Sequence, residues 1–312
     1  MTHKKSVIIS ITMVIIAFSS IYTNLAYSKT VRKKNIVKTG HLIMDQTWSG
    51  KVLITGDVII PEGVTVKIKP GTKIVFAHGE SDFDADIPLG GHVTKKRCNI
   101  IVKGRLKAVG TKKKPVRFGL SSEEIIRSNR WGGIVFMSES ASQLKDCVIE
   151  NAVFGITFLG KESTKLERLT IEKCNIGIYC AGDSKSVVSG TVVRNCGTGV
   201  EITENAAPVV EYNYIAKNEW GISTAERSKP SITNNTIIKN ELGINCNSQK
   251  DINIMFNEIQ SNKIGVRCAS TNAVFTKNKI FNNTVGLEYN AAKLPKMVKN
   301  KLSKNKINVR EK

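Results

Sequence analysis

The sequence predicts an all-β protein, a single-stranded right-handed parallel β-helix (solenoid) with about 22 residues per coil. One observation is a glycine that returns every 22 residues, and another is a pair of aliphatic columns in register with it, directly after the glycine and six residues before it. The third is a local alternation of apolar residues, as in Phe154, Ile156 and Phe158, which is typical of a strand with one buried face. The recurring glycines are Gly133, Gly155, Gly177, Gly199, Gly221, Gly243, Gly265 and Gly286.

Equivalent strands of successive coils run in the same direction, so they are expected to pair in parallel and to wind with the right hand of parallel crossovers. Each coil then rises by one strand spacing, roughly 4.8 Å. The column from Gly155 to Gly286 is predicted to form a structural turn with positive φ. The next position of the register holds Asn308, and asparagine is the residue that best replaces glycine in that conformation.

Two asparagine columns accompany the glycines. Stacked side-chain amides can hydrogen-bond along the axis and satisfy polar groups that a turn would otherwise bury, so we interpret both columns as structural ladders and not as ligand sites. One column lies three residues before the glycine: Asn218, Asn240, Asn262, Asn283 and Asn305. The other lies eight residues before it: Asn213, Asn235, Asn257, Asn278 and Asn300.

The order of segments is that of an exported solenoid. Residues 1–28 have a basic start, an apolar core and a small-x-small motif ending at Ser28, which predicts a signal peptide that is cleaved there and leaves no transmembrane anchor. Residues 29–44 form a basic segment, 45–136 form irregular coils, and 137–312 form regular coils that end in a lysine-rich coil. The mature protein is therefore expected in the periplasm or outside the cell.

The charge balance predicts the class of partner. The chain has 47 Lys and Arg against 26 Asp and Glu, a formal charge of +21, and loss of Lys4 and Lys5 with the signal peptide leaves +21 − 2 = +19. Such an excess favours an acidic polysaccharide or another polymer of the cell envelope. Nucleic acid is not expected, because no aromatic residues interleave with the basic ones. We expect a monomer or a weak oligomer.

The lysines near the C-terminus have two interpretations, protection of the last strand edge or binding of a polyanion. They are Lys293, Lys296, Lys299, Lys301, Lys304 and Lys306.

Seven cysteines in an exported chain raise the question of disulfides. Most of them occupy columns that elsewhere hold apolar core residues, which favours a packing role. Cys246 and Cys268 lie on adjacent coils, where parallel side chains have poor geometry for a bridge, and the sequence leaves open whether they are bridged.

Several stretches carry a family resemblance. PGTKIVF (from Pro70), GRLKAVGTKKKPVRF (from Gly104), WGGIVF (from Trp131) and repeats such as NTIIKNELGI (from Asn235) resemble exported bacterial right-handed β-helix proteins of the pectin-lyase-like superfamily. The repeats are also similar to those of NosD-type periplasmic proteins. The resemblance implies the fold; it does not select an activity, because the superfamily includes lyases, hydrolases, epimerases, adhesins and members of unknown role.

The catalytic constellations of that superfamily are not found in the sequence. The Gly-His-Gly and Arg-x-Lys set of polygalacturonase-like hydrolases is absent, as is the Asp-Pro-His-Glu of the epimerases, and aspartates are few in the repeats. The remaining catalytic candidates are Glu150, Glu172 and Arg194, which should stack on consecutive coils. Two carboxylates about 5 Å apart suit a retaining glycosidase, whereas Arg194 would neutralise them.

A column two residues after the glycine is predicted to face outward, as a glycan-binding strip or as an ordinary solvated face. Its glycan-binding candidates are Tyr179, Glu201, Asn245 and Arg267.

An acidic loop at 78–96 interrupts the irregular coils. Asp82, Asp84 and Asp86 alternate there and offer the oxygen ligands that Ca²⁺ prefers, although the glycine of an EF-hand loop is missing. The alternative is a solvated acidic loop that offsets the lysines beside it. Apart from this possible Ca²⁺, no cofactor is expected.

Two functions follow from these observations. The first is a non-catalytic binding or scaffold protein for an anionic glycan or envelope polymer. The alternative is a polysaccharide-active enzyme, a lyase or a glycoside hydrolase, which would require a convergent cluster of acid, base and metal ligands.

Overall fold

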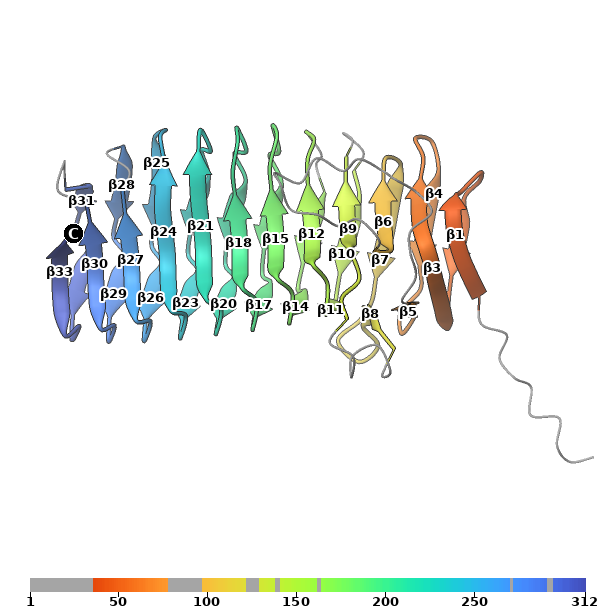
Figure 1. Cartoon of the computed structure of the whole chain (residues 1–312), viewed down its shortest axis with the longest axis horizontal. Helices are drawn as coiled ribbons and strands as arrows, with labels where there is room; N and C mark the ends of the chain where they lie inside the picture. Colours follow the sequence, from red (N-terminus) through yellow and green to blue (C-terminus); the bar gives the residue numbers. More distant parts are fainter. Residues whose placement is uncertain are drawn as a thin grey trace, which may run out of the picture. The chain divides into compact units, whose positions relative to one another are not determined.

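The computed structural model describes residues 36–77, 97–121, 129–137, 141–161, 164–269, 272–290 and 294–312. Ile36–Lys312 forms one unit, in which the strands stack in chain order along one axis (Figure 1). None of the described residues lies in a helix. The predicted signal peptide and the acidic loop at 78–96 lie outside the described residues.

Each coil contributes strands to three parallel ladders, here named A, B and C. The first strands, β1 (Ile36–His41) and β3 (Lys51–Ile60), run through both A and B, and this joins the two ladders into one 22-stranded sheet. Because β1 begins at Ile36, the solenoid starts inside the segment 29–44 that was expected to precede it.

Ladder A continues through β5 (Lys73–Phe76), β8 (Val116–Leu120), β11 (Cys147–Glu150), β14 (Thr170–Glu172), β17 (Val192–Arg194), β20 (Tyr214–Ala216), β23 (Thr236–Ile238), β26 (Glu258–Gln260), β29 (Lys279–Phe281) and β32 (Lys301–Ser303). Ladder B continues through β6 (Asn99–Val102), β9 (Gly133–Phe136), β12 (Phe154–Phe158), β15 (Ile176–Cys180), β18 (Thr198–Ile202), β21 (Trp220–Glu226), β24 (Leu242–Ser248), β27 (Ile264–Cys268), β30 (Val285–Tyr289) and β33 (Ile307–Glu311). Ladder C is the 11-stranded sheet of β2 (Gln46–Trp48), β4 (Thr65–Ile68), β7 (Arg105–Val109), β10 (Gln143–Lys145), β13 (Lys165–Glu167), β16 (Val187–Ser189), β19 (Val209–Glu211), β22 (Ser231–Thr233), β25 (Ile252–Met255), β28 (Ala273–Thr276) and β31 (Lys296–Val298).

The strand register confirms the predicted parallel β-helix and its coil length. Ile149 pairs with Ile171, 22 residues later, and every pairing of the three ladders is parallel. In the first coils the step is irregular, since Ile36 pairs with Val52, 16 residues later, whereas Ile74 pairs with Phe118, 44 residues later. The regular repeat therefore begins after those coils.

The interior is filled by the predicted aliphatic columns. Ile215 and Ile237 are fully buried on adjacent strands of ladder A, and Ile222 is fully buried in ladder B. Near the N-terminal end, the rings of Phe76 and Trp131 stack with centroids 3.8 Å apart. One continuous core thus runs along the unit.

Both asparagine ladders are confirmed. Asn240 Nδ2 donates to Asn262 Oδ1 at 3.0 Å, and that oxygen also accepts the backbone N–H of Asn240 at 2.9 Å. In the second ladder Asn235 makes the same pair of bonds to Asn257. Each oxygen therefore satisfies two buried donors of the preceding coil, which is the structural role expected of these side chains.

The predicted turn role of the glycine column is wrong. These glycines lie within the strands of ladder B, and the column from Gly155 to Gly286 does not adopt positive φ. A Cβ on Gly221 would lie 2.4 Å from the carbonyl oxygen of Gly243, and one on Gly155 would lie 2.5 Å from that of Gly177. Glycine is required because the backbone of the next coil occupies the space of a side chain.

Positive φ occurs instead at two other columns, which hold mostly non-glycine residues. They lie four and nine residues before the glycine, each directly before an asparagine ladder. The first comprises Asn151, Lys173, Asn195, Lys217, Lys239, Ser261, Asn282 and Lys304. The second comprises Asp146, Arg168, Gly190, Tyr212, Asn234, Phe256, Lys277 and Lys299. Positive φ places these residues in the left-handed backbone conformation, so we call their two columns the left-handed columns. They turn the chain at two corners of every regular coil.

The prediction that the apolar residues on both sides of the glycine share one buried face is also wrong. Ile156 and Phe158 belong to the main core, but Phe154 belongs to a separate cluster with Ile176 and Tyr179. The rings of Phe154 and Tyr179 lie 5.5 Å apart. The glycine therefore interrupts the alternation, and the residue before it packs on the outer side of the sheet.

Candidate binding surfaces

The three catalytic candidates stack as predicted. Glu150 pairs in register with Glu172, and Glu172 with Arg194, on consecutive strands of ladder A. Arg194 Nε lies 2.7 Å from Glu172 Oε2. This ion pair occupies one of the two carboxylates, so the geometry is that of a neutralised surface pair; whether the pair has any catalytic role remains a prediction.

The glycan-binding candidates form one column on ladder B, but the column is not uniformly exposed. Tyr179 pairs with Glu201, and Asn245 pairs with Arg267. Tyr179 is only 2% exposed and packs in the outer cluster with Phe154. The expectation that the tyrosine faces solvent is wrong, because apolar residues on the outer side of the sheet bury it.

The C-terminal part of the same column is an ion-pair ladder. Glu288 is buried between Arg267 and Arg310 of the neighbouring coils, and Arg267 Nε lies 2.6 Å from Glu288 Oε1. Burial by itself would raise the pKa of Glu288, but hydrogen bonds from Arg310 and Arg267 outweigh it and hold the pKa below its ordinary value. Asn245 donates to Ser223 Oγ at 3.3 Å. Both Arg267 and Asn245 thus already serve contacts within the protein.

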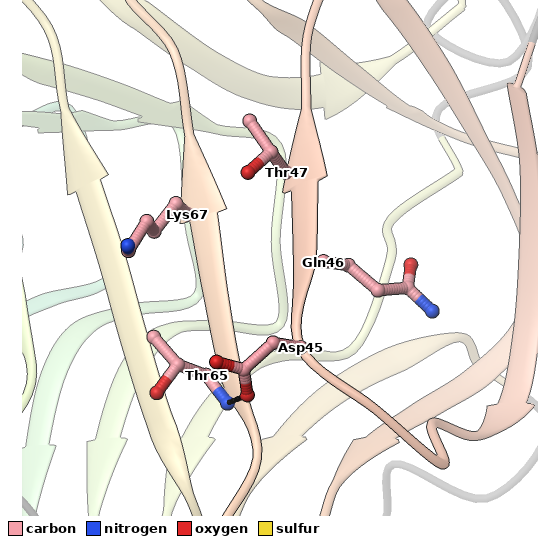
Figure 2. Close-up of a pocket in the computed structure, with 5 residues that line it drawn as sticks. All are labelled: Asp45, Gln46, Thr47, Thr65 and Lys67. Carbon is pink, nitrogen blue, oxygen red and sulfur yellow. Dashed lines mark hydrogen bonds between the residues drawn. The ribbon is translucent and has the colours of Figure 1, made fainter.

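A small polar pocket lies beside β2 and β4 (Figure 2). It has a volume of about 90 Å³ and is lined by Asp45, Gln46, Thr47, Thr65 and Lys67. Asp45 Oδ1 accepts a hydrogen bond from the backbone N–H of Thr65 at 2.7 Å, so its carboxylate caps a strand. Small-molecule sites typically measure about 300–1,000 Å³, so this pocket does not accommodate a sugar chain.

The calcium candidates Asp82, Asp84 and Asp86 lie outside the described residues. Within the described ranges, no group of three or more His, Cys, Asp or Glu side chains could hold a metal ion. All seven cysteines are buried and none forms a disulfide, so Cys246 and Cys268 are not bridged. Burial raises the pKa of the Cys147 thiol to about 12. The cysteines therefore act as core residues, as their register predicts.

The exposed aromatic residues were not found by sequence reasoning. Tyr212 is 62% exposed and Phe256 is 47% exposed, and both lie in the left-handed column nine residues before the glycine. That column differs from the asparagine column directly after it because its residue types change from coil to coil. Such variation is the signal that could have indicated solvent-exposed positions.

Solved structures with a related fold come from proteins of different activities. The A-module of the Azotobacter vinelandii mannuronan C-5 epimerase AlgE4 is 12% identical, with 85% of this chain and 91% of that chain covered and a TM-score of 0.51. The Dettilon tailspike protein is 11% identical, with 85% and 61% covered and a TM-score of 0.53. A double mutant of the periplasmic alginate epimerase AlgG is 13% identical, with 80% and 61% covered and a TM-score of 0.42.

This chain therefore spans about three fifths of the tailspike and of that AlgG chain. At these identities the likeness shows the fold alone. No curated protein matches the chain.

Within the described part of the chain, no helix is long and apolar enough to cross a membrane. The family described as periplasmic copper-binding protein (NosD) matches residues 118–312, which is more than half of the chain and includes all the regular coils. The repeats that it matches are the coils whose glycine, asparagine and aliphatic columns build ladders A, B and C. The chain is therefore a member of the NosD family.

Proposed function

We propose that this protein is a periplasmic binding or scaffold protein whose outer surface holds an anionic polymer of the cell envelope. The observation that carries the proposal is the stacking of exposed lysines at the left-handed corners. Lys217 and Lys239 occupy equivalent positions on adjacent coils, as do Lys277 and Lys299. Like charges about one coil spacing, roughly 4.8 Å, apart repel one another, and a polyanion lying along the column would remove that repulsion.

Several acidic side chains of the described surface already form ion pairs with other basic residues. Asp146 pairs with Arg168 at 2.7 Å, and Glu167 with Lys145 at 2.9 Å. The described lysines of the C-terminal coil are also exposed. The net charge of the mature chain, +21 − 2 = +19, therefore supports attraction of a polyanion over a large surface.

The location follows from the family and from the first residues of the chain. NosD proteins are described as periplasmic. We propose that residues 1–28 direct export and are then removed, which leaves the solenoid free in that compartment. Sequencing the N-terminus of the protein recovered from a periplasmic extract tests this, and a first residue before Lys29 would contradict cleavage after Ser28.

The description of the family also names copper. Thiolates and imidazoles are the ligands that copper prefers. The described residues include a single histidine, His41, and their cysteines are buried without forming a metal cluster. Cys147 stays a neutral thiol at physiological pH because of its raised pKa. The described residues do not fit a copper centre, so no step of the proposed function involves copper.

Two structural relatives are named for alginate or mannuronan. Their low identity makes this a likeness of fold, so the proposal of a glycan partner rests on the charge of this chain. The polysaccharide-active enzyme remains the alternative, with Glu150, Glu172 and Arg194 as its residues.

The test is a binding panel for the mature protein with polygalacturonate, polymannuronate, lipopolysaccharide and neutral dextran, scored for retention and for new reducing or unsaturated ends. We expect retention of the acidic polymers only, falling steeply between low and physiological salt. Retention of neutral dextran that salt does not weaken would refute the proposal. New chain ends that disappear in Glu150→Gln and Glu172→Gln would establish the enzyme instead.

A further inference from the structure

A continuous row of exposed side chains runs along the corner between ladders C and A. We call it the corner ridge and define it as Tyr212, Asn234, Phe256, Lys277 and Lys299, one residue from each of five consecutive coils. All five have positive φ, between 53° and 57°. The first four ridge residues are tied to the coil that follows: the backbone N–H of Tyr212 donates to the carbonyl of Thr233, and that of Phe256 to the carbonyl of Thr276. The rigid backbone thus holds five side chains in line.

The ridge residues point outward because the side chains that follow them in the sequence are buried. The residue after each of them belongs to an asparagine ladder; Asn213 and Asn257, for example, are at most 2% exposed. The ridge therefore cannot bury its own side chains. Exposed aromatic residues that are held rigidly in line are typical of a binding surface.

The order of residue types along the ridge has chemical meaning. Tyr212 and Phe256 are two coils apart, about 9.6 Å, with the amide of Asn234 between them. In an extended 1,4-linked polysaccharide a sugar is about as long as one coil spacing, so alternate sugars meet the two rings. A sugar presents an apolar C–H face to an aromatic ring, and the amide can hydrogen-bond the hydroxyl groups of the sugar between them.

The remaining two residues of the ridge select for charge. Lys277 and Lys299 continue the row on the next two coils, and both are exposed. Lys277 Nζ lies over the Phe256 ring, 5.3 Å from its centre, so a cation covers one face of the second aromatic ring and the sugar would stack on the other face. Carboxylates on successive sugars would meet these two ammonium groups.

Two acidic residues flank the ridge. Glu258 is already paired with Lys279 at 2.8 Å, and Glu211, which is half-buried, ends a strand of ladder C beside Tyr212. The positive charge of the ridge thus lies at its C-terminal end and the aromatic contact at its N-terminal end. A uniform polyanion such as polyphosphate would contact only the lysines at the C-terminal end.

We propose that the corner ridge binds a linear 1,4-linked polyuronate that lies along the solenoid axis, stacks on Tyr212 and Phe256, and pairs its carboxylates with Lys277 and Lys299. This inference rests on the proposed function and adds to it the site and the class of polymer. The ridge spans four coil spacings, about 19 Å, so about five sugars fill it.

The experiment measures affinity by calorimetry for oligomannuronates and oligogalacturonates, in a size series from disaccharide to octasaccharide. Tyr212→Ala and Phe256→Ala are compared with Trp220→Ala, a similarly exposed aromatic residue on ladder B that is 40% exposed. The double variant Lys277→Gln/Lys299→Gln is compared with Lys51→Gln/Lys73→Gln, which removes the same charge from a pair of exposed lysines in register on β3 and β5. Unfolding midpoints of all variants verify that the fold is retained.

We expect affinity to rise up to about a pentasaccharide and then to level off. Each ridge variant should weaken binding about five- to tenfold, and the controls less than about twofold. Equal losses in the two lysine variants, with no effect of Tyr212→Ala or Phe256→Ala, would overturn the ridge while the proposed function stands. No binding of any acidic polymer would overturn both. A change of sedimentation in the aromatic variants without a change of affinity would assign the ridge to self-association and refute the proposal.

Discussion

Substitution of Gly221 separates two physical reasons for the glycine column. If the column required positive φ, Gly221→Asn would be tolerated, as Asn308 is at the equivalent position of the last coil. In the structure a Cβ at Gly221 would lie 2.4 Å from the carbonyl oxygen of Gly243 and 3.1 Å from Ile237 Cγ2. Asn308 is accommodated because its strand, β33, pairs only with the preceding strand β30 among the described strands.

The expected loss of stability on substitution of Gly221 follows from the atoms that would have to move. The carbonyl of Gly243 belongs to a strand that is hydrogen-bonded on both sides, and Gly243 itself lies so close to the next coil that a Cβ there would be 2.4 Å from the carbonyl oxygen of Gly265. Inserting a carbon atom into such a place costs about 3 kcal/mol or more. For a solenoid of this length that corresponds to a fall of about 6 °C in the unfolding midpoint.

Gly190 is the matched control. It has φ of +58°, and a Cβ there would meet no heavy atom closer than 3.9 Å. Gly190→Asn should therefore change stability by less than about 0.5 kcal/mol, since asparagine adopts this conformation readily. Thermal and urea unfolding followed by circular dichroism compare Gly221→Ala, Gly221→Asn and Gly190→Asn. Equal midpoints for Gly221→Asn and the parent protein, or equal losses at both sites, would refute the steric explanation.

Three further predictions concern the ladders, pH and calcium. Asn240→Ala should lower the free energy of unfolding by about 2–3 kcal/mol, because it leaves the buried backbone N–H of Asn218 without its acceptor, and amide exchange at Asn218 should accelerate; unchanged exchange would contradict the ladder's role. Because the pKa of Glu288 is lowered in the folded protein, its ion pairs stabilise the fold fully above the unfolded pKa of about 4.3 and lose that contribution as pH falls through the lower folded value. Glu288→Gln should therefore flatten the acid limb of a curve of stability against pH. An unchanged acid limb would exclude these ion pairs as a source of acid sensitivity. The loop with Asp82, Asp84 and Asp86 should bind Ca²⁺ weakly, and calorimetry that detects no heat at millimolar Ca²⁺, or the same heat after all three are changed to asparagine, would remove the site.

The column structure of the sequence made much of the fold predictable. In a solenoid each coil packs only against its neighbours, so a period of 22 residues translates directly into strand register. Asn240 and Asn262 could be placed one above the other for this reason, and Glu172 beside Arg194 likewise. Parallel stacking at one strand spacing makes such contacts nearly independent of the rest of the molecule.

Other features could not be predicted because residue type does not reveal them. Lys217 and Phe256 have left-handed backbones although neither residue favours that conformation, and the hydrogen bonds of the asparagine ladders hold them there. The burial of Tyr179 depends on outer apolar contacts, with Phe154 among them, that lie beyond the repeat itself. For the candidate sites, the sequence indicated charge and columns, while exposure was decided by the packing on each face.

The sequence by itself determined the parallel β-helix, its 22-residue coil and the two asparagine ladders, because each is a nearest-neighbour property that repeats along the chain. Only the tertiary structure decided why glycine recurs, which corners carry positive φ, and which aromatic residues face solvent. These depend on where backbone atoms of one coil meet those of the next, as the carbonyl of Gly243 meets Gly221, and a spacing of residues along the chain carries no information about such distances.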